Sequence, residues 1–361
     1  MIDRRTFLAS SALATSPAWA EGLRRVAPTT RFGLVTYLWG RDLSLPVLLK
    51  ACADTGLDGV ELRTTHAHGV EPGIGEAEAS AVRTQAEDAG VAIVGLGSNE
   101  RFDSPDSRRV AAAIEATRGF IRASAAVGGG GVKVKPDSFH PGVEPGATIE
   151  QIALSLATLG PFAADHGQEI RLEVHGGCAD PAVIAEIVAR ADHPAVRVCW
   201  NCNPQDLRGP GFRHHYDLLR PRFGGTLHVR ELDAGDYPVQ ELVQLLDRDG
   251  YDGFVLLEAH SPPPPARTEA LGLQRRYFER LVSIGRRPSA APGAIRIEPR
   301  GGSPGAPEVA GYDVRVGDEP FATLRFGEGE RTPSIFPLFA PGRLGVLRTF
   351  PFARIAGESD D

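Results

Sequence analysis

The chain alternates between short apolar runs and longer stretches in which apolar residues recur at helical spacing. Apolar runs of about four to eight residues that end at glycine or polar residues are typical of buried strands, and apolar positions three and four residues apart are typical of amphipathic helices. The runs predict strands over Phe32–Trp39, Asp58–Arg63, Val91–Gly97, Val132–Lys135, Ile170–His175, Val196–Asn201, Gly225–Leu232 and Phe254–Ala259. The helical stretches are 44–56, Glu76–Ala89, Asp106–Val127, Thr148–His166, Pro181–Ala191, His214–Leu219, Val239–Asp249 and Glu269–Ile284.

Strands that alternate this regularly with helices, through short connections, indicate parallel pairing with right-handed crossovers. Eight such units close a barrel, and a chain of 361 residues is long enough for one barrel of about 250 residues with additions. The sequence therefore predicts an α/β fold, a TIM (β/α)8 barrel over residues 31–285, with a short β-rich C-terminal extension.

The composition changes after the barrel. Proline, glycine, serine and alanine dominate residues 286–311, which is typical of a linker. Only Ala294–Pro299 is strand-like there. Within residues 312–361, Tyr312–Val316 and Pro320–Phe326 predict a hairpin, and Ser334–Phe339 and Leu344–Phe350 can add strands. We expect these residues to form a partial β-rich segment, because so few strand residues cannot build a large core.

The first twenty residues have the features of an export signal. Arg4 and Arg5 precede an apolar run that ends at Ala18–Ala20, a pattern similar to a twin-arginine signal with its cleavage site. We expect a periplasmic or secreted protein, although an ordinary signal with a chance arginine pair stays open. No later apolar run has the length of about twenty residues that a spanning helix needs, so we expect no stable membrane insertion after signal removal.

Charge and cysteine content narrow the function. The net charge of −7 and the absence of a basic patch argue against nucleic acid as a partner. The four cysteines are too few and too scattered for a disulfide framework, and for the Cys199–Cys202 pair we favour packing over a zinc or redox role. The sequence leaves the oligomeric state open.

Four polar residues stand at corresponding ends of the last four predicted strands. Active sites of such barrels lie at the carboxyl ends of the strands, so these side chains are expected to meet. Two carboxylates, an amide oxygen and an imidazole suit a divalent metal, and Mn²⁺, Mg²⁺, Co²⁺ and Zn²⁺ all remain open. The predicted ligands are Glu173, Asn201, His228 and Glu258.

Two carboxylates beside a metal can divide the work of moving a proton. One removes a proton next to a carbonyl and the other returns it, while the metal polarises the carbonyl oxygen. We expect Glu173 and Glu258, on strands five and eight, to be this catalytic pair.

Several other residues are candidate substrate contacts, each with a structural alternative. Lys135 and Lys133 share a face of their strand, and we favour Lys135, at the strand end, for binding a substrate oxygen. Either lysine can instead pair with a barrel acid. Glu61 can contact substrate or support a metal ligand. His66 and His68, in the following loop, can each contact substrate or simply be solvated. Arg230 can bind a substrate oxygen or form a salt bridge. His175 and His260, each two residues past a proposed ligand, can contact substrate or support that ligand.

Short motifs in the same order along the chain carry a family resemblance: Gly59–Arg63, Leu172–His175, Trp200–Asn203, His228–Glu231 and Leu257–Glu258. With them, residues 31–284 resemble the xylose-isomerase-like barrels of the sugar phosphate isomerase/epimerase superfamily. The resemblance implies a divalent-metal site at Glu173, the strand-six position, His228 and Glu258, with the glutamates as acid and base.

The chain departs from that family at two places. Asn201 stands where the family usually has aspartate, which removes a negative charge, and Pro204 stands where ketose 3-epimerases have a substrate-binding histidine. Pro333–Asp361 is similar to the start of a PmoA-like domain, without the histidine-rich part expected next, so we expect a truncated segment.

The resemblance leads us to expect a metal-dependent isomerase or epimerase of a sugar or sugar-like polyol. Two alternatives remain: a lyase or dehydratase acting on a keto-sugar or keto-glycoside, and a non-catalytic sugar-binding barrel. A small-molecule carbohydrate is the expected partner in each case.

Overall fold

The computed structural model describes residues 30–285, 295–300, 311–316, 319–325 and 334–338. The predicted export signal, the strand at Leu344–Phe350 and most of the PmoA-like segment lie outside these residues. Export therefore stays a prediction. None of the helices in the described ranges combines the length and the apolar character needed to cross a bilayer.

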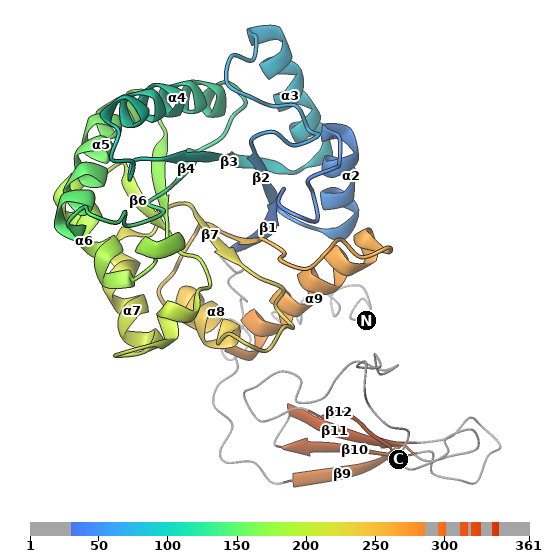
Figure 1. The fold of residues 1–361 in the computed structure, drawn as a ribbon. Coiled ribbons are helices and arrows are strands. Elements are labelled where there is room, and N and C mark those ends of the chain that lie inside the picture. Colours follow the sequence, from blue (N-terminus) through green and yellow to red (C-terminus); the bar gives the residue numbers. More distant parts are fainter. Residues whose placement is uncertain (1–29, 286–294, 301–310, 317–318, 326–333, 339–361) are drawn as a thin grey trace, which may run out of the picture.

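Eight parallel strands form one sheet that curls into a barrel (Figure 1). They are β1 (Arg31–Val35), β2 (Gly59–Arg63), β3 (Ala92–Arg101), β4 (Gly131–Lys135), β5 (Glu169–Glu173), β6 (Val196–Cys199), β7 (Thr226–Val229) and β8 (Phe254–Leu257). β1 pairs with both β2 and β8, and the seam between β6 and β7 is bridged by the His228 amide, which donates to the Trp200 carbonyl at 2.8 Å. The predicted TIM barrel is confirmed.

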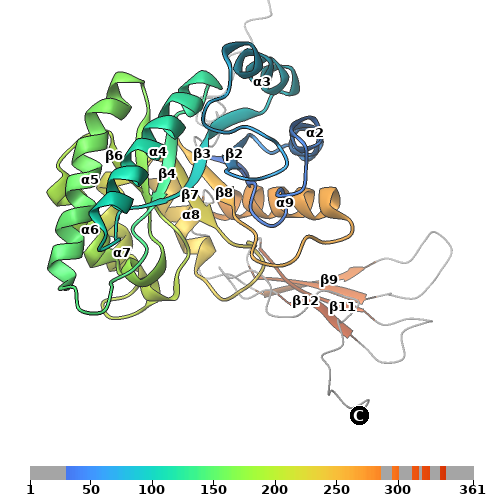
Figure 2. The same ribbon diagram turned by 45° about the horizontal axis from the view of Figure 1, so that its top comes forward.

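Helices surround this sheet, as Figure 1 and the turned view in Figure 2 show. They are α2 (Leu45–Thr55), α3 (Glu76–Ala89), α4 (Ser107–Ala126), α5 (Pro145–Asp165), α6 (Pro181–Ala191), α7 (Phe212–Leu219), α8 (Val239–Arg248) and α9 (Arg267–Gly285). Short 3-10 turns lie at Gly176–Cys178, Pro204–Leu207 and Arg220–Arg222. Each predicted helix is present.

The largest differences from the predicted boundaries are at β1 and β3. β1 ends at Val35 rather than Trp39, because the Tyr37 amide already turns back to the Val35 carbonyl at 2.6 Å. β3 continues past Gly97 to Arg101, where it pairs with Lys135 after a register shift. This extension carries polar residues of β3 beyond the barrel mouth.

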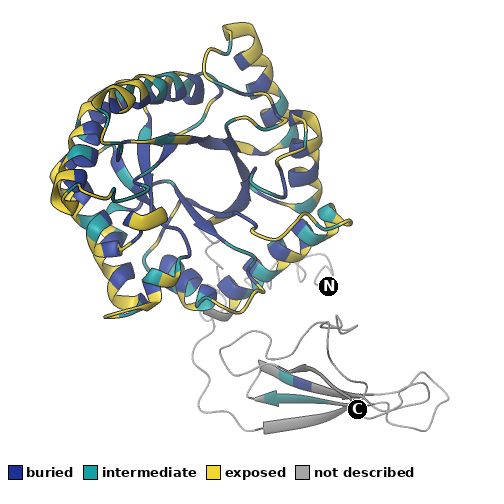
Figure 3. Ribbon diagram, in the orientation of Figure 1, coloured by how far each residue is buried: buried dark blue, intermediate teal, exposed yellow. Residues whose placement is uncertain are grey.

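The core has two parts, which Figure 3 shows as the dark-blue inner faces of the helices and strands. The larger part packs outward-facing strand residues against the helices. The smaller part consists of Val35, Val94, Phe254 and Leu256, which fill the barrel below the polar strand ends. Burial of these apolar side chains stabilises the barrel by about 25 cal/mol per Å² removed from water.

Deeper still, Arg171 closes the opposite end of β5. Its Nη1 donates to the Val94 carbonyl at 2.9 Å and its Nε to Glu169 Oε2 at 2.9 Å. These contacts offset the cost of burying the guanidinium, so β5 carries charged residues along its inward face.

Residues 295–338 include an antiparallel sheet in the order β12-β11-β10-β9. Its strands are β9 (Ile295–Arg300), β10 (Gly311–Val316), β11 (Glu319–Arg325) and β12 (Ser334–Leu338). β10 pairs with β11 from Gly311 opposite Arg325 to Val316 opposite Glu319, which confirms the predicted hairpin. β9 lies within the stretch whose composition suggested a linker.

Candidate metal and acid–base site

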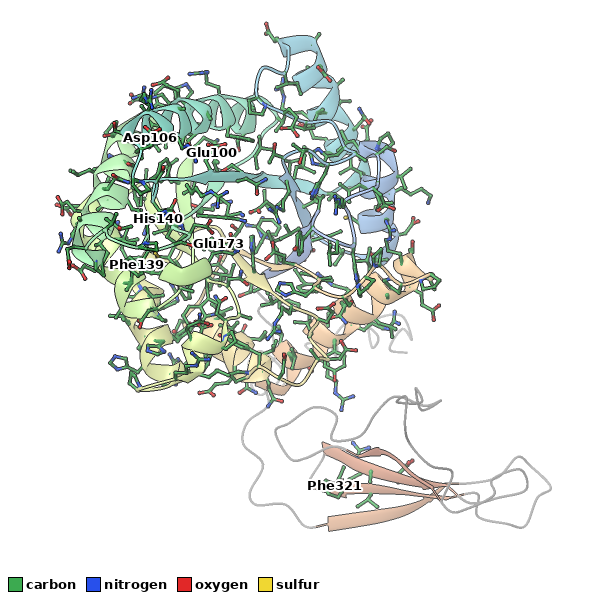
Figure 4. The ribbon with its side chains drawn as sticks, viewed as in Figure 1. Glu100, Asp106, Phe139, His140, Glu173 and Phe321 are labelled. Carbon is green, nitrogen blue, oxygen red and sulfur yellow. The ribbon has the colours of Figure 1, made fainter. Side chains whose placement is uncertain are left out.

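A cluster of charged side chains fills the barrel just below the carboxyl ends of the strands. Alternation along each strand points these residues inward, and all of them are at most 5% exposed. Figure 4 shows Glu173 inside the ring of strands. The cluster comprises Glu61, Lys133, Glu173, Asn201, His228 and Glu258.

His228 lies at the centre of the cluster. Its Nδ1 is 3.5 Å from Glu173 Oε1 and 3.6 Å from Glu258 Oε2. On the other side of the ring, Nε2 is 3.3 Å from Glu61 Oε1. Gly97 leaves the space for Glu61, since a Cβ there would lie 2.8 Å from Glu61 Oε1. One imidazole nitrogen therefore faces two carboxylates, and the other faces a third that can fix the ring.

Two protein donors hold Glu173. Lys133 Nζ lies 2.8 Å from Oε2, and Asn201 Nδ2 donates to Oε1 at 2.9 Å. The Asn201 oxygen accepts from the Cys202 amide at 2.8 Å, which fixes the orientation of the side-chain amide. Asn201 thus presents its NH₂ group, and not its oxygen, to the cluster.

Glu258 is held from the mouth of the barrel by Arg63. Arg63 Nη1 is 3.6 Å from Glu258 Oε1, and Nη2 donates to Asn99 Oδ1 at 2.9 Å. The guanidinium also lies 4.9 Å from the centre of the Tyr37 ring, a cation–π contact. Each proposed catalytic carboxylate therefore has its own protein cation.

These charges set the protonation of the cluster. Burial opposes ionisation, but Lys133 and His228 outweigh it at Glu173 and hold the pKa of that carboxyl well below its usual value. Burial also opposes ionisation of Glu258, where the charge of His228 dominates and lowers the pKa. For His228, burial disfavours the charged form, yet Cys199, Glu61 and Glu258 raise its pKa well above normal. The carboxylates are therefore ionised near neutral pH.

The geometry fits a divalent cation. Glu173, His228 and Glu258 each offer one ligand atom, and these atoms lie within 4.8 Å of one another. The imidazole-to-carboxylate separations of 3.5 and 3.6 Å are too long for good hydrogen bonds, and neither ring nitrogen of His228 has a hydrogen-bond partner. Ligands about 2.1 Å from one ion lie about 3 to 3.5 Å apart, so this spacing suits a shared ion. The type of donor atom agrees with the spacing, because two oxygens and one nitrogen suit Mn²⁺, Co²⁺ or Zn²⁺.

The barrel and the strand-end polar cluster agree with what a comparison with protein families finds. Residues 49–277 match the model of the xylose isomerase-like TIM barrel. The chain belongs to this family. A search of the curated proteins finds no match.

Solved structures with the same fold include several sugar epimerases. L-ribulose 3-epimerase superposes with a TM-score of 0.59 at 17% identity, covering 71% of this chain and 96% of that one. The 3-keto-D-glucoside 4-epimerase YcjR from E. coli gives 0.58 at 15% identity, covering 68% and 99%. The IOLI protein with a bound zinc atom gives 0.60 at 15% identity, covering 70% and 98%. At these identities the likeness is one of fold.

The two histidines after β2 differ in their surroundings. His66 is partly buried at the mouth, 3.2 Å from Thr36 Oγ1, and burial together with the nearby Arg63 charge lowers its pKa to about 4. His68 is buried and bridges the Arg63 carbonyl, at 2.7 Å, and the Val70 amide, at 3.0 Å. His66 therefore keeps a free ring edge for a ligand, whereas His68 supports the loop.

The remaining candidates lie around the rim. Lys135 is half-buried at the end of β4, and burial lowers its pKa. Arg230 pairs with Asp236 at 3.0 Å, which is the salt-bridge alternative. His260 is exposed, with its ring 6.0 Å from that of Tyr37. Of the predicted substrate contacts, Glu61 lies deepest, and it contacts His228.

His175 is positioned by Asp137. Its Nδ1 lies 3.1 Å from Asp137 Oδ1, and Arg101 pairs with the other oxygen of the same carboxylate. Asp137 has a φ of 59°, a left-handed conformation that costs a non-glycine residue about 1 kcal/mol or more. Its carbonyl accepts from the Cys178 amide at 3.0 Å, which secures the turn. The sequence contains no signal for Asp137, because nothing in its neighbours indicates positive φ.

A buried network supports the loop that follows Asn201. Tyr237 donates to Asp206 Oδ2 at 2.7 Å, the Asn203 amide donates to the same oxygen at 2.8 Å, and the Trp200 indole donates to Tyr237 at 3.1 Å. Burial raises the pKa of Asp206 to about 6. The folded state therefore retains this proton at a pH where the unfolded chain has lost it.

This shift predicts a pH-dependent stability difference between the parent and Asp206→Asn. Since the folded pKa of about 6 lies above the usual 3.8, the parent loses stability as the pH rises from about 4 to 6. Between pH 4.5 and 7 the unfolding free energy of the variant should gain about 2 kcal/mol relative to the parent. Urea unfolding at pH 4.5 and pH 7 measures this change. If the free-energy difference between Asp206→Asn and the parent is the same at both pH values, the raised pKa of Asp206 is contradicted.

Proposed function

We propose that this protein is a metal-dependent isomerase or epimerase that moves a proton next to the carbonyl of a sugar or sugar-like polyol. One observation supports this above all: His228 Nδ1 faces Glu173 and Glu258 at 3.5 and 3.6 Å, and a separate protein cation holds each carboxylate in place. The family membership and the sugar epimerases of the same fold support a carbohydrate as the substrate class.

Glu173, His228 and Glu258 are the proposed metal ligands. A divalent cation bound there would polarise the substrate carbonyl. We propose that Asn201 serves this site through its NH₂ group, by orienting Glu173, since its oxygen is taken by the Cys202 amide. Glu61 Oε1 lies 3.3 Å from Nε2 across the imidazole, where its charge would favour a proton on that nitrogen and leave Nδ1 to bind the metal.

We propose that the two carboxylates move protons on opposite faces of the substrate. Glu173 comes from β5 and Glu258 follows β8, with the imidazole between them. Glu173, kept ionised by Lys133, removes the proton, and the bonding electrons move onto the carbonyl oxygen. Glu258 passes a proton from water to the carbon, and the hydroxide left behind takes up the proton held by Glu173, so that both carboxylates are restored. The Arg63 guanidinium stabilises Glu258 once it is again a carboxylate.

A panel of aldoses, ketoses and 3-keto-glycosides in D₂O tests the proposal. Isomerisation or epimerisation should place deuterium at the carbon next to the carbonyl, visible by NMR, and the reaction should stop when EDTA removes the metal. A new ultraviolet absorption from an unsaturated ketone would instead favour the lyase alternative. Binding without deuterium exchange for every sugar would favour the non-catalytic barrel.

A further inference from the structure

A hollow of about 610 Å³ lies beside the barrel mouth, between the extended end of β3, the first turns of α4 and the loop after β4. In Figure 4, Glu100 lies toward α4, and His140 lies to its lower left. Its size is within the range of about 300 to 1,000 Å³ of small-molecule sites. The polar residues lining it include Asn99, Glu100, Arg101, Asp103, Arg109 and His140.

One contact chain links this hollow to Glu258. Asn99, in its wall, accepts from Arg63 Nη2 at 2.9 Å, and Arg63 Nη1 lies 3.6 Å from Glu258 Oε1. The hollow is thus two side chains away from the proposed acid.

A second chain links it to the other carboxylate. Arg101, also in the wall, pairs with Asp137, which holds His175 at 3.1 Å, two residues after Glu173. The two contact chains therefore lead from the wall of the hollow to Glu258 and to the residue two positions after Glu173.

The lining indicates the chemistry of that ligand. Two arginines, Arg101 and Arg109, are balanced by Glu100 and Asp103, so the hollow does not favour an anion such as a phosphate. Asp103 is 5% exposed and rigid, since it accepts from the Ser138 amide at 3.1 Å and faces His140 Nε2 at 3.0 Å. Carboxylate, guanidinium, amide and imidazole groups in neutral balance suit the hydroxyls of an uncharged sugar.

The α4 wall leaves room for a ring. Ala112, Ala113 and Ala116 line it, where larger side chains would fill the space. Small apolar residues opposite polar ones match the two sides of a pyranose, whose ring face is apolar and whose edge carries hydroxyls.

We propose that this hollow is a subsite for a second sugar ring, so that the substrate class is a keto-glycoside or disaccharide rather than a free monosaccharide. The inference builds on the proposed function, because the first ring occupies the site at Glu173 and Glu258. The glycosidic oxygen would lie between the two, near Arg63 and His175.

Calorimetric titration of the full chain with methyl α-D-glucopyranoside, maltose and cellobiose, with and without MnCl₂, tests the subsite. At least one disaccharide should bind about tenfold more tightly than the methyl glucoside. Ala112→Phe, at an exposed position of α4, should fill the hollow and bring the ratio of the two dissociation constants to about one. Ala111→Phe is the matched control, since Ala111 is equally exposed on the same helix and does not line the hollow.

The outcomes separate this inference from the proposed function. Disaccharides that bind no better than the methyl glucoside, or that do not bind at all, would overturn the subsite, as would equal effects of the two phenylalanine variants. A disaccharide preference lost only in Ala112→Phe supports it, even where no sugar exchanges deuterium. In that case the subsite stands and the isomerase proposal fails.

Discussion

Glu173→Gln is expected to lower the turnover number on the best substrate of the D₂O panel by about a thousandfold. Glutamine has the same shape but cannot accept a proton, and its amide cannot pair with Lys133 as the carboxylate does at 2.8 Å. A loss of this size follows if Glu173 is the base. Deuterium incorporation measured by NMR under saturating substrate gives the turnover directly.

Glu169→Gln is the matched control for this variant. Glu169 is also a glutamate of β5, but it lies at the opposite end of the strand, where it pairs with Arg171. Its substitution should leave turnover within about threefold of the parent, since it touches no reacting group. Full activity in Glu173→Gln would remove Glu173 from the chemistry, and equal losses in both variants would point to misfolding.

Lys133→Met is expected to lower the unfolding free energy of the metal-free protein by about 3 to 5 kcal/mol. Both Lys133 and Glu173 are fully buried, so removing the ammonium leaves a carboxylate without its cation in the barrel. Divalent metal would then supply the missing charge. Mn²⁺ should raise the melting temperature of Lys133→Met more than that of the parent, and calorimetry should show tighter Mn²⁺ binding by about tenfold or more.

Lys135→Met provides the comparison. Lys135 shares the inward side of β4 but is only half-buried at the strand end. Its substitution should change stability by less than about 1 kcal/mol and leave Mn²⁺ affinity as in the parent. An equal response of the two variants to Mn²⁺ would show that Lys133 does not control the charge at Glu173.

The barrel was predictable because its signal is repeated. Each apolar run carries the same alternation and is followed by a helix with its own start and stop residues, so errors at single boundaries, as at Trp39, do not change the fold. The convergence of Glu173, His228 and Glu258 follows from the same regularity, because parallel strands bring their carboxyl ends to one face.

The details of the site depend on features that alternation does not encode. Lys133 and Lys135 share a face, and the sequence favoured Lys135 because it is nearer the strand end. In the structure, Lys133 pairs in register with Arg171, one inward position below Glu173, and its long side chain reaches up to the carboxylate. The direction in which Asn201 presents its amide depends on the Cys202 amide, a contact that forms only in the folded loop.

Arg63 and Asp137 were not predicted to support the site, because their roles depend on long-range contacts. Arg63 occurs in a recognised motif, but its contact with Glu258 joins two strands far apart in the chain. Asp137 acts through a left-handed backbone conformation and two side chains, one from β3 and one from the loop after β5. Such long-range contacts require the register of the barrel, which the sequence pattern does not set.

The most direct test of the account is the position of a bound metal. Crystals soaked in MnCl₂ and measured at the manganese absorption edge should show one anomalous peak in the barrel, about 2.0 to 2.3 Å from an oxygen of Glu173, an oxygen of Glu258 and Nδ1 of His228. A peak elsewhere, or no peak with Lys133 still against Glu173, would contradict a metal site built from these three residues.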